Sequence, residues 1–102
     1  MARRDTAAKH DDILRELNEE RAAALLRISS TLDSLIAQLR ASRERLAKTH
    51  GVDRPREVAA YRALRAEALR YRWYLEVQRE ALGLRHHQRL DEFYPIPSAL
   101  DA

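Results

Sequence analysis

The sequence predicts an all-α protein whose main element is a long antiparallel two-helix hairpin, and three observations support this. The 102 residues include 17 Ala and 17 Arg but only 2 Gly and 3 Pro, a composition that strongly favours helix. Apolar residues recur every three or four positions over two long segments, as in coiled-coil seams. Gly51 and Pro55 lie between these segments, where one helix can end and another begin.

The first helix is predicted over residues 11–48. Residues 1–10 are charged and are expected to fray, and Asp11 or Asp12 can cap the helix that follows. A narrow apolar stripe predicts its buried side: Leu14, Leu17, Ala24, Leu25, Ile28, Leu32, Leu35, Leu39 and Leu46.

A turn over residues 49–53 leads into a second helix over residues 54–82. Its buried side is predicted to carry Tyr61, Leu64, Ala68, Tyr71, Leu75 and Leu82. A turn this short makes the helices antiparallel neighbours, so position i should face roughly position 103 − i. This register places Ser42 opposite Tyr61 and Leu35 opposite the small Ala68.

The second helix is also apolar on its reverse side, at Ala59, Ala66, Leu69, Trp73 and Val77. A hairpin buries only one side of each helix. The C-terminal strap (residues 84–102), a second copy of the chain or a foreign protein must therefore cover the reverse side. We expect a homodimer that forms a four-helix bundle. The expected interface residues are Leu69, Trp73, Tyr74 and Val77, because aromatic residues dominate interface energetics.

Residues 84–102 form the C-terminal strap. Gly83 should end the second helix, and Tyr94-Pro95-Ile96-Pro97 should be extended. The strap is expected to cross the open end of the hairpin and cover Leu14, Leu17 and Trp73. The alternative is a peptide that docks on another protein.

Arg21 occupies a position of the first stripe where Leu is expected, opposite Gln78. We expect these two residues to form a buried polar layer that fixes the register, with Asp91 or Glu92 as a further partner. The alternative is a site for an anion or for a partner protein.

Four arginines line one flank of the second helix: Arg62, Arg65, Arg72 and Arg79. They could contact phosphates, so a nucleic-acid-associated protein is the alternative function. Glu76 interrupts the row and favours a salt-bridged surface instead. A third hypothesis is a small enzyme that binds an anionic metabolite between Arg21, Arg72 and Arg79.

Other classes of function have no sequence support. Cys is absent, the four His residues have no metal-ligand spacing, and no apolar run of 18 residues or signal peptide is found. We therefore expect a non-enzymatic, cytoplasmic interaction module without catalytic residues, metal, cofactor or membrane contact.

Overall fold

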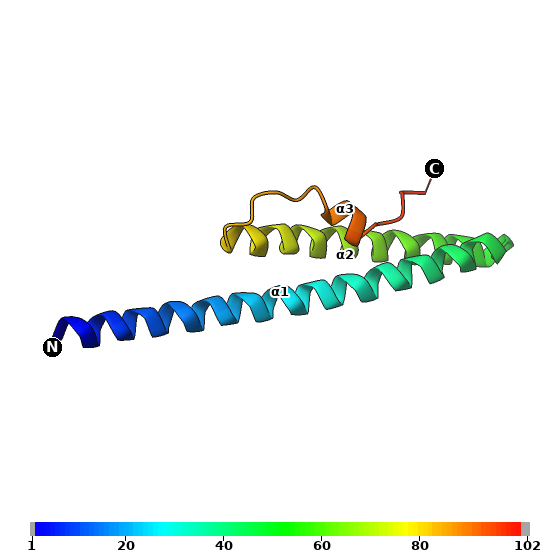
Figure 1. Cartoon of the computed structure of the whole chain (residues 1–102). Coiled ribbons are helices and arrows are strands. Elements are labelled where there is room, and N and C mark those ends of the chain that lie inside the picture. Colours follow the sequence, from blue (N-terminus) through cyan, green and yellow to red (C-terminus); the bar gives the residue numbers. More distant parts are fainter. Residues whose placement is uncertain (1, 101–102) are drawn as a thin grey trace.

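The computed structural model describes the backbone of residues 2–100 and the side chains of residues 6–100. It contains α1 (Ala2–Lys48), the 3-10 turn η1 (Gly51–Asp53), α2 (Arg54–Ala81) and the short α3 (Leu90–Phe93), with no strand in this range. Helices α1 and α2 form the predicted hairpin (Figure 1), and the chain as a whole measures 77 × 23 × 16 Å. None of the helices found in residues 2–100 is long and apolar enough to cross a membrane.

Helix α1 begins at Ala2, nine residues before the predicted start at residue 11. The stretch before Asp11 contains three alanines and two arginines but neither Gly nor Pro, so nothing in it opposes helix formation. Asp11 and Asp12 therefore lie inside the helix and do not cap it. With 47 residues, α1 is about 70 Å long.

The two glycines lie where the sequence predicts that the helices end, Gly51 after α1 and Gly83 after α2. Gly51 and Gly83 both have positive φ, at +69° and +85°, which Gly adopts without steric cost. The Arg54 guanidinium donates to the carbonyls of Leu46 and Thr49 at 2.9 and 3.2 Å and so satisfies the end of α1. Asp53 precedes α2, but its carboxylate makes no capping hydrogen bond.

The core lies between α1 and α2 and extends from Leu46 and Tyr61 near the turn to Leu32 and Leu75, most of the way along α2. Leu32, Leu39, Tyr61, Ala68 and Leu75 are at most 2% exposed. Ser42 and Tyr61, which the register places opposite each other, are both fully buried. Contacts between the helices keep this register: Arg45 pairs with Glu57 at 3.5 Å, and Arg21 donates to the Ala81 carbonyl at 3.4 Å.

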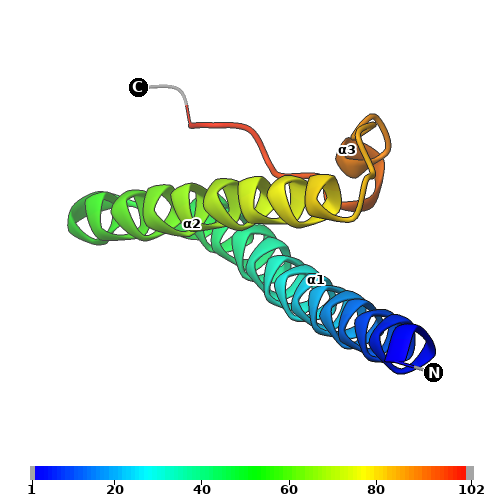
Figure 2. The same ribbon diagram turned by 90° about the vertical axis from the view of Figure 1, so that its left-hand side faces the viewer.

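The two helices diverge away from the turn, and α1 continues beyond the end of α2 (Figures 1 and 2). All residues from Thr6 to Glu20 are exposed. We call residues 6–20 the N-terminal arm. Leu14 and Leu17 belong to it, so the apolar stripe of α1 extends past the part that α2 covers.

The strap does not take the predicted path over Leu14, Leu17 and Trp73. After Gly83 it turns back along α2 toward the hairpin turn (Figure 1). It buries Leu90 and packs Tyr94, Ile96 and Leu100 against the core. Leu14, Leu17 and Trp73 remain exposed, because the strap follows hydrogen-bond donors on α2 rather than the open end of the hairpin.

Ser42 provides a test of the core. Its hydroxyl is buried and has no hydrogen-bond partner among the described residues, which costs stability. Ser42→Ala should raise the free energy of unfolding by about 1 kcal/mol more than Ser30→Ala does. Ser30 is an exposed residue of the same helix, so it controls for the higher helix propensity of Ala. Urea denaturation measures both changes, and equal gains would contradict the expected cost of the buried hydroxyl.

Candidate functional site

The side of α2 that faces away from α1 carries an exposed apolar surface. We call Ala66, Leu69, Trp73 and Val77 the α2 stripe. Leu69, Trp73 and Val77 are 43%, 59% and 40% exposed, far more than ordinary core residues. Their spacing of four residues keeps them on one side of the helix, so three of the four expected interface residues share one continuous surface.

Tyr74, the fourth expected interface residue, lies on the flank of α2 rather than on the stripe. Its ring makes an edge contact with Tyr71 at 5.4 Å and a tilted contact with Trp73 at 5.6 Å. Tyr71 is half-buried against the core. Tyr74 therefore links the exposed Trp73 to the packed interior and limits the orientations of the indole.

A small cavity extends the α2 stripe toward the end of the strap. Its volume is about 160 Å³. Its lining residues are Tyr61, Arg62, Arg65, Ala66, Leu69, Ala99 and Leu100. The strap thus borders the stripe and leaves its centre open.

Three of the four arginines on the flank of α2 hold the strap. Arg65, Arg72 and Arg79 are seven residues apart, or about 10.5 Å, on one side of the helix; we call them the arginine row. Arg65 donates to the Pro97 carbonyl at 2.9 Å, Arg72 forms an ion pair with Asp91, and Arg79 donates to the His86 carbonyl at 2.8 Å. The fourth, Arg62, makes no ion pair or hydrogen bond within residues 6–100.

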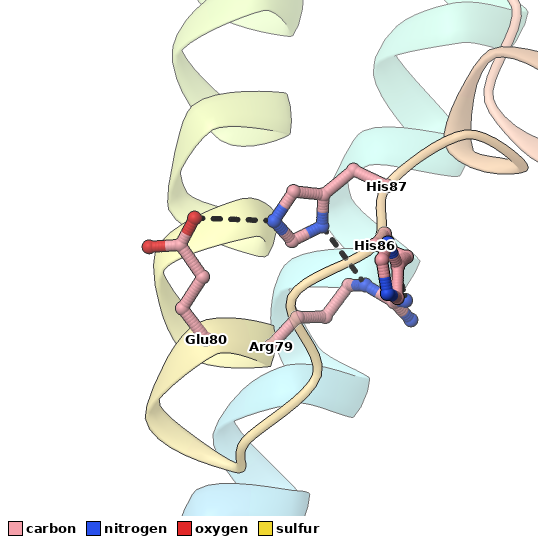
Figure 3. A network of polar contacts seen from close by, with 4 residues as sticks. All are labelled: Arg79, Glu80, His86 and His87. Atoms are coloured by element: carbon pink, nitrogen blue, oxygen red, sulfur yellow. Dashed lines mark hydrogen bonds and ion pairs between the residues drawn. The ribbon is translucent and has the colours of Figure 1, made fainter.

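The start of the strap is fixed by a second polar network (Figure 3). The Nε–H group of Arg79 donates to Nδ1 of His87 at 3.4 Å, and Nε2 of His87 lies 3.2 Å from Oε1 of Glu80. Since arginine can only donate, Nδ1 must be the acceptor and Nε2 must carry the proton that Glu80 accepts. His87 is half-buried here, and His86 contributes its carbonyl.

A third contact fixes the far end of the strap. The Tyr61 hydroxyl donates to the Ser98 carbonyl at 2.6 Å and accepts a hydrogen bond from Arg43 of α1 at 3.4 Å. Arg43 also donates to the Ser98 hydroxyl at 3.3 Å. One buried tyrosine thereby connects both helices and the strap, a role that its place in the apolar pattern does not reveal.

The expected buried polar layer does not form. Arg21 and Gln78 are only half-buried, because the helices have diverged at this level and water reaches both side chains. Arg21 binds the Ala81 carbonyl at the end of α2, whereas Asp91 pairs with Arg72. The buried polar residue of the hairpin is Ser42.

The cations proposed to hold an anionic metabolite do not converge on one cavity. Arg21, Arg72 and Arg79 each bind a different acceptor of the chain itself. A cavity of about 430 Å³ lies next to Arg79 and is lined also by His86, Gln88, Arg89, Leu90 and Phe93. Within the described residues, no group of three or more His, Asp or Glu side chains is placed to hold a metal ion.

Comparisons with models of known families, with curated proteins and with solved structures found no match.

The attachment of the strap can be tested at Tyr61. Tyr61→Phe removes the hydroxyl that binds Ser98 and should lower the free energy of unfolding by about 1 kcal/mol. It should also make residues 84–100 more susceptible to limited proteolysis. The control is Tyr71→Phe, because Tyr71 is half-buried and its hydroxyl makes no hydrogen bond within the described residues. Equal proteolysis of the two variants would show that this contact does not hold the strap.

Proposed function

We propose that the protein is a non-enzymatic helical interaction module that forms a homodimer through the α2 stripe and Tyr74. The two hairpins would together form a bundle of four helices. The observation that carries this proposal is the α2 stripe, an apolar surface with an exposed tryptophan at its centre. Exposed apolar patches of this kind mark sites of protein interaction, and tryptophan is enriched among residues that dominate binding energy.

The large accessible surface of the chain supports the proposal that it binds a second copy. The accessible surface is 7874 Å², whereas a globular monomer of this mass exposes about 5,900 Å². The difference, roughly 1,900 Å², exceeds the ~800 Å² that each partner buries in a standard interface. The radius of gyration of 20.1 Å likewise exceeds the ~13 Å expected for a compact domain of this length. A second copy can therefore bury a standard interface without any rearrangement of the hairpin.

The alternative function, binding of nucleic acid, receives less support. Of the four candidate arginines, only Arg62 has no acceptor in the described chain, and the arginine row is engaged by the strap. Phosphate binding would have to displace these contacts. Affinity for a DNA or RNA duplex that falls steeply with salt concentration would favour this alternative.

The dimer is tested by light scattering on a sizing column at two concentrations. Trp73→Ala should weaken association at least about tenfold, equivalent to 1.4 kcal/mol, because it truncates the central residue of the stripe. The control is Leu26→Ala, since Leu26 is 69% exposed on α1 and lies outside the stripe. A wild-type chain that remains monomeric at the higher concentration would refute the homodimer.

A further inference from the structure

The N-terminal arm repeats the side of α1 that packs against α2. Leu14 and Leu17 precede Leu32 and Leu35 by 18 residues each, which is five complete helical turns. Leu14 therefore points the same way as Leu32, and Leu17 the same way as Leu35. All four leucines lie on one side of α1, but only Leu32 and Leu35 are buried. The arm thus presents a helix-packing surface to solvent.

The α2 stripe is the matching surface on the other helix. Trp73 and Val77 are each two residues from the buried Leu75, and a step of two residues turns the side chain by about 200°. The stripe consequently lies opposite the contact between α1 and α2. The strap is held by the arginine row on the flank of α2 and leaves the stripe exposed.

We propose that the arm of a second copy covers the α2 stripe, so that two chains exchange their arms. This inference rests on the proposed homodimer through the α2 stripe, but it changes the packing. Three helices, namely α1 and α2 of one chain and the arm of the other, lie side by side at each level in place of four. Each α2 would be packed between α1 of its own chain and the arm of the partner. The two α1 helices would run antiparallel on the outside, with the two α2 helices end to end between them. A twofold axis relates both contacts, so the assembly closes at two chains.

The lengths of the elements agree with this arrangement. Helix α1 has 47 residues and α2 has 28. The excess of 19 residues corresponds to about 28 Å, whereas the stripe from Ala66 to Val77 spans about 17 Å. The arm is therefore long enough to cover the whole stripe, and the end-to-end placement of the α2 helices leaves it room.

The charges contribute little to this arrangement. Residues 11–20 contain five carboxylates and one cation, Arg15. Near the end of α2, Arg70, Arg72 and Arg89 already pair with carboxylates of their own chain, and Arg79 donates to the His86 carbonyl. The contact therefore depends on its apolar surfaces, because ion pairs at exposed sites add little stability.

A pair of cysteines tests the exchange directly, because the chain has no native Cys. Leu14→Cys and Val77→Cys are introduced into the same chain, which is treated with a mild oxidant and with a short bismaleimide. Val77 lies at the level of residue 26 of its own α1, on the far side of α2, so position 14 of the same chain is about 18 Å farther along the hairpin. A disulfide needs Cα atoms closer than about 7 Å, so position 14 can reach position 77 only in another chain. We expect a covalent dimer, in several-fold higher yield than for Arg15→Cys with Val77→Cys, whose arm cysteine is turned about 100° away from position 14.

Two further chains decide the remaining outcomes. Leu14→Cys alone should not cross-link, and efficient cross-linking would show that arms pack on each other, which overturns the proposal. Leu14→Ser/Leu17→Ser, which leaves the α2 stripe intact, should weaken dimerisation at least tenfold while circular dichroism stays helical. If the Leu14→Cys/Val77→Cys variant is itself monomeric and cannot cross-link, the effect of Leu14→Ser/Leu17→Ser on dimerisation tests the arm exchange instead. A wild-type dimer sensitive to Trp73→Ala but not to Leu14→Ser/Leu17→Ser would refute the arm exchange and leave the homodimer standing.

Discussion

The structure depends on one constraint, which is that two helices in a hairpin can bury only one side of each. The contact between α1 and α2 encloses Leu32, Leu39, Tyr61 and Leu75, and the helices diverge beyond it (Figure 2). This core is narrow, since an elongated chain of 102 residues gains less buried surface than a globular one. Much of the apolar surface left over lies in two places, the N-terminal arm and the α2 stripe, whereas Leu26, Val52, Leu84 and Phe93 are exposed elsewhere.

The C-terminal strap covers only part of the apolar surface that the hairpin leaves exposed, and it is held in place largely by polar contacts. Its apolar residues Leu90 and Ile96 pack on the hairpin, but its path is defined by the arginine row and by Tyr61. Arginine suits this task because its long apolar stem lies along a helix while its guanidinium reaches carbonyl and carboxylate oxygens. The same engagement removes the arginine row from the surface available to phosphates. The basic composition of α2 thus has a structural explanation within the chain itself.

The sequence predicted the helices, the turn and the register, because these depend on local rules. Heptad-like spacing, two glycines with positive φ and a proline in the first turn of α2 act over short distances. The path of the strap could not be predicted in this way. Arg72 can pair with Glu76 on its own helix or with Asp91 on the strap, and the two choices have similar energies at a partly exposed site. Arg21 was expected to be buried because the seam pattern gives no sign that the two helices diverge before the level of Arg21.

The unequal lengths of the two helices connect the fold to its proposed assembly. If α1 ended where α2 does, the hairpin would have no arm, and only the stripe of a second copy or a foreign partner could cover the α2 stripe. As it is, the stripe that faces away from α1 and the arm that α2 does not reach are both apolar, exposed and of compatible length, and they occur in the same chain. A chain that carries both halves of a contact but cannot join them internally, because they lie at different levels along the hairpin, can satisfy both by pairing with a copy of itself. Self-association then requires no feature beyond those that already build the hairpin.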